Sequence, residues 1–251
     1  MTRNLRLDRG DGVALAYDLV PGRGPTVVFL PGFHSDMAGV KAIHTLAFCE
    51  QRGRAMLRLD YSGHGESGGA FTEGSIGRWC ADALAVIDAV TTGEVLLVGS
   101  SMGGWIGLLI ALARPGRVVG LVGIAAAPDF TERLMWQAMA PAERLLLERE
   151  GRITHPSEYG EALVITHELI ADGRRHLLLD APIALDMPVR LLQGQRDADV
   201  PWETAVTLAE RLTGADVRVV LVKDGDHRLS RPADLALLGQ ILGGLLGEDG
   251  A

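Results

Sequence analysis

The sequence is poor in several kinds of residue, and each scarcity excludes a class of protein. Its 251 residues include two cysteines, Cys49 and Cys80, far apart and without CxxC spacing, which argues against a disulfide framework or a zinc site. The net charge is −8, and no run of basic residues occurs, so a groove for a nucleic-acid backbone is not expected. Only two lysines are present, Lys41 and Lys223, which we interpret as compositional bias without mechanistic content.

The hydropathy pattern of the sequence predicts neither a membrane protein nor a secreted protein. No apolar run reaches the ~18 residues that suggest a membrane span. The first twenty residues, MTRNLRLDRGDGVALAYDLV, show no charged segment followed by an apolar core of the kind found in signal peptides. We therefore predict a cytoplasmic protein with reduced thiols, no cofactor, no metal and no nucleic-acid partner. The sequence leaves the oligomeric state open.

Short β-branched runs alternate with helical patterns along most of the chain. Helical periodicity covers residues 75–91, 102–114, 202–213 and 232–246. The alternation predicts a mostly parallel, doubly wound α/β sheet that helices cover on both faces. An antiparallel hairpin near residues 4–8 and 12–18 precedes it. The buried strands are predicted at residues 25–30, 54–60, 94–99, 118–126, 189–194 and 216–222.

Residues 128–186 interrupt this alternation, because they contain helical patterns and no convincing strand. Pro141 suits the first turn of one of these helices, and Gly151 suits the position just after its end. A loop of this length without structure would be unusual in a compact domain. We therefore expect a helical cap at 128–186, inserted into a core domain of residues 1–127 and 187–251.

Two adjacent serines follow a strand-like run in the segment GSSMGG. Only Ser101 has a glycine two positions before and two positions after it, at Gly99 and Gly103. A G-x-S-x-G segment between a strand and a helix is the nucleophile elbow, whose tight turn brings the flanking residues together. Larger residues flank Ser100, so Ser101 is the predicted nucleophile. The alternative is a plain strand–helix turn or a phosphate-binding loop.

The predicted base and acid follow in the order Ser, Asp, His that this elbow requires. His227 lies directly after the last predicted strand and is the candidate base. Three aspartates compete for the role of the orienting acid. Asp226 is the sequence neighbour of the histidine, so its side chain should point away from the imidazole. Asp199 should face solvent or cap the following helix. We predict Asp197, which would accept the Nδ1–H of the imidazole.

The oxyanion hole and the substrate contacts are expected around the elbow. Its two donors should be the backbone N–H groups of Met102, after the nucleophile, and of Phe33, after Gly32. We also expect substrate contacts from three side chains near these donors or in the cap, namely His34, Trp105 and Trp136.

Six motifs carry a resemblance to a known family: PGF at 31–33, DYSGHGES at 60–67, GSSMGGW at 99–105, ARP at 113–115, DADVPW at 197–202 and DHR at 226–228. Together they resemble the α/β-hydrolase-domain serine hydrolases that include the mitochondrial palmitoyl-protein thioesterase, also described as an acyl-glucuronide esterase. The likeness extends over most of the chain from about residue 25. It implies an α/β-hydrolase fold and hydrolysis of thioesters or oxygen esters, with Ser101, Asp197 and His227 as the triad.

The resemblance also implies a structural role for the turn at 60–67, which would support the oxyanion loop, that is, the loop after the strand at 25–30 that contains Gly32 and Phe33. We interpret His64 as part of that turn. We expect no targeting presequence, in contrast to the family, so the mitochondrial location is not expected to carry over. His34 differs from the residue expected there, which leaves the leaving-group preference open.

Two other functions remain alternatives at this point. A carbon–carbon bond hydrolase uses the same triad beneath a cap, and a ligand sensor can be built on the same scaffold with an unused triad. The expected substrates of the leading interpretation are small acyl esters or acyl thioesters, acylated proteins among them.

Overall fold

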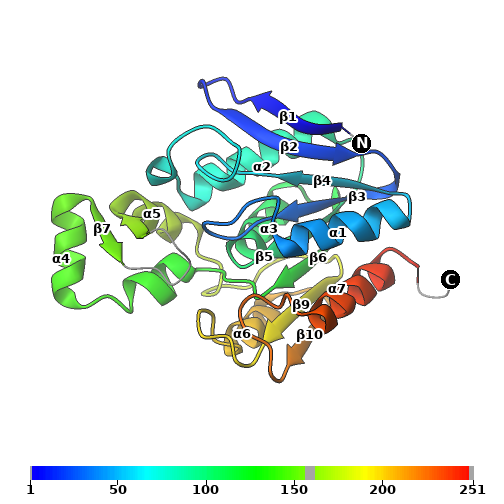
Figure 1. Ribbon diagram of the computed structural model, residues 1–251. Coiled ribbons are helices and arrows are strands. Elements are labelled where there is room, and N and C mark those ends of the chain that lie inside the picture. Colours follow the sequence, from blue (N-terminus) through cyan, green and yellow to red (C-terminus); the bar gives the residue numbers. More distant parts are fainter. Residues whose placement is uncertain (1, 156–161, 249–251) are drawn as a thin grey trace.

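An eight-stranded sheet forms the centre of the protein in the computed structural model (Figure 1), which describes residues 2–155 and 162–248. The strands are ordered β1-β2-β4-β3-β5-β6-β9-β10. The first two pairs in this order are antiparallel, and all the others are parallel. The predicted mostly parallel α/β fold is confirmed. The strands are β1 (Thr2–Asp8), β2 (Ala14–Val20), β3 (Arg23–Leu30), β4 (Arg54–Leu59), β5 (Val95–Ser100), β6 (Val118–Ile124), β9 (Val189–Gly194) and β10 (Val217–Val222).

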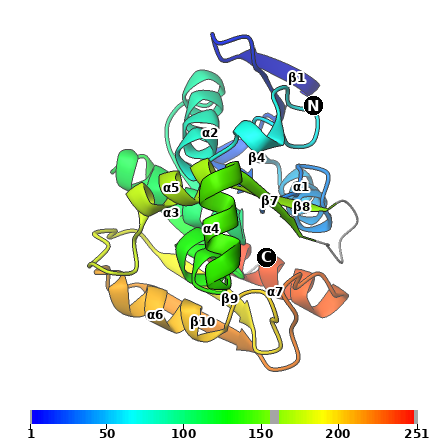
Figure 2. The ribbon, with the colours of Figure 1, turned by 90° about the vertical axis from the view of Figure 1, so that its left-hand side faces the viewer.

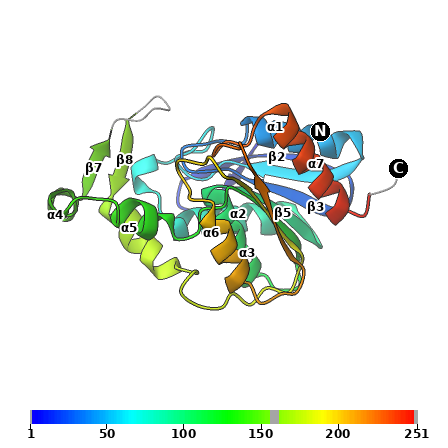
Figure 3. The same ribbon diagram turned by 90° about the horizontal axis from the view of Figure 1, so that it is seen from below.

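Helices cover both faces of this sheet (Figure 3). One face carries α1 (Val40–Gln51) and α7 (Pro232–Leu245), and the other carries α2 (Ile76–Val90), α3 (Met102–Ala113) and α6 (Glu203–Arg211). Successive side chains of a strand point to opposite faces. In β3, accordingly, Val27 and Phe29 join the core beneath α1 and α7, whereas Val28 and Leu30 join the core beneath α2 and α3.

Helix α1 was not among the predicted helices, and its composition explains why. It begins after Gly39, whose position provides no side-chain cap. Its buried positions include Thr45 and Cys49 beside larger apolar residues, so the apolar stripe is weak in the sequence. Both cysteines are buried and free, in agreement with the expected thiols.

The segment between β6 and β9 projects from the carboxyl ends of the parallel strands (Figures 1 and 2). It contains a wide helical turn, η2 (Thr131–Trp136), followed by α4 (Pro141–Glu150), β7 (Arg152–His155), β8 (Leu163–Thr166), α5 (His167–Gly173) and η3 (Arg174–His176). As expected, α4 begins at Pro141, and Gly151, with a φ of 74°, directly follows its last residue. A small apolar cluster of its own holds the segment together: Met139, Leu147, Ile153, Ile165 and Ile170.

The expectation that this segment contains no strand was wrong. β7 and β8 pair antiparallel, with Ile153 opposite Ile165. The run Leu-Val-Ile-Thr at 163–166 is rich in β-branched residues, but it stands between stretches of helical composition, and the local pattern favoured a helix over the whole of 157–173. Residues 157–161 of that predicted helix lie outside the described residues.

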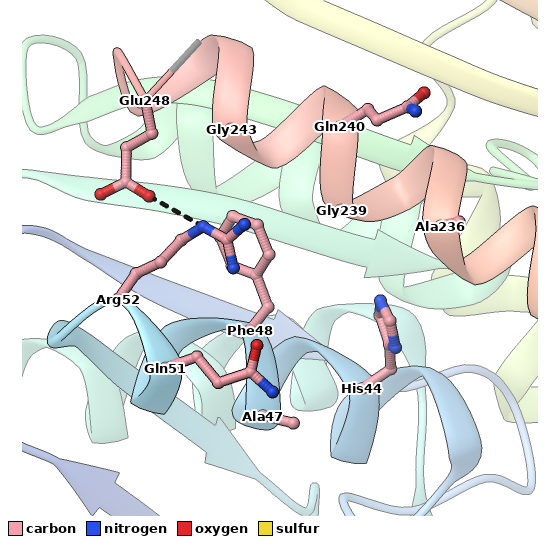
Figure 4. A pocket seen from close by; sticks show the side chains of 10 residues that line it. All are labelled: His44, Ala47, Phe48, Gln51, Arg52, Ala236, Gly239, Gln240, Gly243 and Glu248. Carbon is pink, nitrogen blue, oxygen red and sulfur yellow. Dashed lines mark ion pairs between the residues drawn. The ribbon is translucent and has the colours of Figure 1, made fainter. Parts of the chain in front are cut away.

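A cavity of about 430 Å³ lies between α1 and α7 (Figure 4). His44 and Phe48 of α1 face the small residue Gly239 of α7 across it. The guanidinium of Arg52 lies over the Phe48 ring, 4.1 Å from its centroid, and forms an ion pair with Glu248. None of the residues lining this cavity belongs to the loops that carry the predicted triad. In the described part of the chain, no helix is long and apolar enough to cross a membrane.

Candidate active site

Ser101 occupies the sharp turn between β5 and α3, with a φ of 53° and a ψ of −118°. Few non-glycine residues adopt a positive φ, and those that do store strain. The flanking glycines make the turn feasible. A Cβ added at Gly99 would lie 2.2 Å from the carbonyl oxygen of Gly103, and one added at Gly103 would lie 2.0 Å from the carbonyl oxygen of Leu30. Both positions therefore exclude any larger residue.

The structure brings the three predicted triad side chains into one hydrogen-bonded chain. His227 Nε2 lies 3.1 Å from Ser101 Oγ, and His227 Nδ1 lies 2.8 Å from Asp197 Oδ2. The loops that carry His227 and Asp197 follow β10 and β9, which pair in parallel up to Val222 and Gly194. Parallel pairing places both loops at the same edge of the sheet as the turn after β5. This arrangement can transfer a proton from the hydroxyl to the imidazole.

The Asp197 carboxylate is fully buried and accepts hydrogen bonds at both oxygens. Oδ1 accepts from the backbone N–H groups of Asp199 and Val200, at 2.9 and 2.8 Å. Oδ2 accepts from His227 and from the side-chain amide of Gln193, at 2.8 and 2.9 Å. Burial by itself would raise the pKa of Asp197. The hydrogen bonds from His227 and the backbone outweigh it and hold the pKa below its usual range.

The two competing aspartates have other roles. The side chain of Asp226 accepts from the backbone N–H of Leu229 and shapes the turn after His227. Asp199 is exposed, and its backbone N–H supports the carboxylate of Asp197. Gln193 was missed by sequence analysis. The available signal was a polar residue directly after two leucines, near the end of β9.

One predicted oxyanion-hole donor follows the serine in the chain, and the other belongs to the loop after β3, which passes beside it. Met102 is the first residue of α3, where backbone N–H groups have no partner within the helix. A Cβ added at Gly32 would lie 3.3 Å from Ser101 Cβ, so the loop after β3 passes directly beside the nucleophile. Within the described part of the chain, neither the N–H of Phe33 nor that of Met102 donates to a protein acceptor.

The end of β4 holds the oxyanion loop at both of its ends. The hydroxyl of Tyr61 donates to the carbonyl of Pro31, at 3.2 Å. At the other end, the N–H of Met37 donates to Asp60 Oδ1 at 2.7 Å, and Arg58 donates to the carbonyl of Met37 at 2.7 Å. Burial raises the pKa of Asp60 to about 6, although two backbone N–H groups stabilise its carboxylate.

The two tryptophans predicted to contact substrate pack within the protein. Trp105 has no exposed surface, and its ring N–H donates to the carbonyl of His176 at 3.1 Å. Its assignment to substrate binding is therefore corrected to a packing role between α3 and η3. Trp136 is half-buried within the projecting segment, where the guanidinium groups of Arg174 and Arg144 lie 4.4 and 5.3 Å from its ring centroid.

The two histidines near the oxyanion loop differ in exposure. His34 is exposed, has a φ of 55°, and stacks on Phe71 with ring centroids 3.8 Å apart. It remains a predicted substrate contact. His64 is buried and hydrogen-bonded through Nδ1 to the carbonyl of Ser62. Burial lowers the pKa of His64 to about 4.

Among the described residues, one group has the spacing of a metal site: Asp197, Asp199 and His227, with ligand atoms within 4.8 Å of one another. The imidazole nitrogen and the Asp197 oxygen already form a hydrogen bond. The group therefore needs no ion to explain its arrangement.

Comparison with known proteins gives a family match and similar relatives. A family model described as "Serine aminopeptidase, S33" matches residues 23–159. The mouse protein named mitochondrial palmitoyl-protein thioesterase ABHD10 is 40% identical over 234 residues, which cover 92% of this chain and 78% of that relative.

Solved structures agree with this match. The mouse alpha/beta hydrolase domain-containing protein 10 superposes with a TM-score of 0.90 at 39% identity, covering 97% of this chain and 98% of the other. A putative hydrolase from Agrobacterium vitis S4 superposes with a TM-score of 0.92 at 39% identity, covering 98% of each chain.

The predicted cytoplasmic location is contradicted by these relatives, because the mouse and human proteins are named as mitochondrial. The prediction depended on reduced thiols and on finding no secretory signal, and the mitochondrial location was set aside because no targeting presequence was recognised. Reduced thiols and the lack of a secretory signal do not distinguish one reducing compartment from another.

Proposed function

The chain belongs to the α/β-hydrolase family of the palmitoyl-protein thioesterase ABHD10, whose members cleave esters and thioesters, and from this premise we propose that it forms an acyl-enzyme on Ser101. The observation that carries the proposal is the continuous hydrogen-bonded chain from Ser101 through His227 to the buried carboxylate of Asp197. A serine hydroxyl is a weak nucleophile unless a positioned base removes its proton.

In the acylation step, His227 Nε2 accepts the proton of Ser101 while Oγ attacks the acyl carbonyl carbon. The tetrahedral oxyanion accepts hydrogen bonds from the N–H groups of Phe33 and Met102, each worth about 3 kcal/mol in the transition state. The imidazolium then protonates the departing thiolate or alkoxide. Asp197 remains ionised throughout and stabilises the imidazolium. Water, activated by the same imidazole, hydrolyses the acyl-enzyme and restores Ser101.

We further propose that residues 128–186 act as a cap over this centre. The segment leaves the core after β6 and returns at β9, on the side of the sheet where the triad lies. Leu134 and Met135 of η2 pack against the main apolar core. An apolar cap favours hydrophobic acyl chains, and acylated proteins are included as substrates because the mammalian relatives carry the name palmitoyl-protein thioesterase.

The decisive experiment uses the two adjacent serines as a matched pair. We expect a fluorophosphonate probe to label the wild-type protein and Ser100→Ala at the same residue, and to leave Ser101→Ala unlabelled. Turnover of a p-nitrophenyl ester should fall by orders of magnitude in Ser101→Ala alone, because only that variant loses the nucleophile. Circular dichroism checks that both variants are folded. Labelling at Ser100, or full turnover by Ser101→Ala, would refute the proposed mechanism.

A further inference from the structure

Lys41 connects the oxyanion side of the site to the loop that carries His227. It lies in the first turn of α1, directly after the oxyanion loop. Its ammonium donates a hydrogen bond to the backbone carbonyl of Arg228, with Nζ 2.5 Å from the oxygen. Arg228 is the residue after His227, so this contact fixes the peptide between Arg228 and Leu229, one residue beyond the base.

Several physical effects oppose a lysine at this position. A cation in the first turn of a helix is disfavoured by the helix dipole. The side chain is half-buried, and within the described part of the chain it forms no ion pair within 4 Å that would offset the loss of hydration. Burial lowers the pKa of Lys41 to about 8, although the charge of Asp226 acts in the opposite direction; the charge of Arg228 lowers it further.

The composition of the chain also sets Lys41 apart, because lysine is rare in it. The sequence contains two lysines, and arginine supplies its other basic side chains. An ammonium is a compact donor suited to one carbonyl, whereas a guanidinium is a planar fork suited to paired acceptors. The geometry at Arg228 presents a single carbonyl to α1. Our sequence-based view of the rare lysines as bias without mechanistic content therefore does not account for Lys41.

We propose that Lys41 is a positioning residue, which holds the loop after β10 against α1 so that the His227 imidazole stays aligned with Ser101 and the oxyanion loop. This inference rests on the proposed function, because it assigns Lys41 a task only if His227 acts as the base. The loop has other supports, such as the hydrogen bond from the N–H of Arg196 to the carbonyl of Gly225, so we expect a misaligned base and a folded protein when Lys41 is replaced.

The contact also gives the site a dependence on pH. The groups whose charges act on Lys41 are Asp226 and Arg228, both in the His227 loop. A hydrogen bond from a charged donor is roughly twice as strong as one from a neutral donor. Because the amine loses its proton as the pH rises through about 8, the loop loosens above that pH and kcat declines.

The experiment compares Lys41→Met and Lys41→Arg with the wild type, using Lys223→Met as the matched control. Lys223 is the other lysine of the chain, and it is exposed in the same loop as His227. We would measure kcat and KM for a p-nitrophenyl ester between pH 6 and about 9.5, with thermal unfolding as the check of folding. Small displacements of a catalytic group can cost up to about a hundredfold in rate. We expect Lys41→Met to lose about tenfold or more in kcat, with KM within about twofold of the wild-type value.

The pH profile separates positioning from plain stabilisation. The kcat of the wild type and of Lys223→Met should decline above pH 8, whereas that of Lys41→Met should lack the decline. Lys41→Arg should have a lower kcat than the wild type, because a guanidinium suits a single carbonyl less well, but it should hold that kcat to a higher pH because the guanidinium stays charged. If Lys41→Met does not fold, the pH profile of kcat for Lys41→Arg tests the inference by itself. A Lys41→Met enzyme within twofold of wild type, or a decline near pH 8 that persists in either variant, overturns the inference. Failure of the proposed function shows separately, as turnover that survives Ser101→Ala.

Discussion

At the scale of single residues, the site depends on the Asp197 carboxylate, which accepts hydrogen bonds from several donors besides the imidazole of His227. Asp197 accepts from two backbone N–H groups and the Gln193 amide in addition to His227. These donors fix both oxygens, so the side chain cannot rotate away from the imidazole. His227 and the two backbone N–H groups also hold the pKa of Asp197 below its usual range despite its burial. A serine site needs both properties, because the acid selects the tautomer of the base and stabilises its charged form.

We expect Asp197→Asn to fold and to lose about four orders of magnitude in kcat, by analogy with the same substitution in serine proteases. The amide presents an N–H group where the carboxylate accepted one, so the imidazole adopts the wrong tautomer. Asp199→Asn is the matched control, since the neighbour contributes its backbone N–H, which the substitution keeps. Steady-state kinetics on one ester, with unfolding midpoints for both variants, tests this. A large loss of kcat in Asp199→Asn instead would show that Asp199, and not Asp197, is the acid that orients His227.

At the scale of elements, the end of β4 fixes the oxyanion loop. Asp60, Arg58 and Tyr61 lie within four consecutive positions, and together they bind Pro31 and Met37 at the two ends of the loop. The turn that follows depends on the same carboxylate. The backbone N–H of Glu66 donates to Asp60 Oδ2 at 2.9 Å. Strand, turn and oxyanion loop are therefore one mechanical unit.

Gly65→Ala tests this unit. Gly65 has a φ of 47°, and a Cβ there would lie 2.2 Å from Asp60 Oδ2. The substitution must displace the carboxylate that holds Met37, so we expect lower stability together with a lower kcat. Gly53→Ala is the matched control, because Gly53 has a φ of 62° with nothing within 4 Å of an added Cβ. Strain alone should cost that control about 1 to 2 kcal/mol of unfolding free energy and leave kcat unchanged. Equal kcat values in the two variants would contradict the coupling.

The elements also show what the sequence could predict. The β-branched strands and the order of Ser101, Asp197 and His227 were readable because each depends on a local pattern or on a rule of chain order. Helix α1 and strand β8 were not, since tertiary burial rather than local periodicity decides them. Gln193 and Lys41 could not be predicted either, because they contact residues in other loops that the fold brings close. No spacing along the chain predicts such contacts.

At the scale of the whole molecule, every part of the proposed mechanism comes from the carboxyl ends of parallel strands. β3 leads to the oxyanion loop, β5 to Ser101, β9 to Asp197 and β10 to His227, and β6 leads into the projecting segment. Open α/β sheets bind their ligands at this edge. In the proposed mechanism the acyl group enters between the core and the segment at 128–186, and we propose that this segment determines the preferred chain length.

The last prediction concerns that determinant. Each methylene that the cap buries contributes up to about 0.8 kcal/mol, until the pocket ends. We expect kcat/KM for esters and thioesters to rise from acetyl to medium acyl chains, and peptide amides to be poor substrates, because an amine leaving group is harder to expel than a thiolate or alkoxide.

We expect the packing within the cap to determine how strongly kcat/KM depends on acyl chain length. Arg144 and Arg174 hold Trp136 within the segment, so Trp136→Ala should loosen the cap and flatten the chain-length profile more than it lowers acetyl turnover. Leu145→Ala, at an exposed position of α4, is the control and should leave the profile intact. The readout is kcat/KM over a series of acyl chain lengths for the three proteins. A wild type that prefers acetyl to octanoyl esters would show that this segment does not bind the acyl chain.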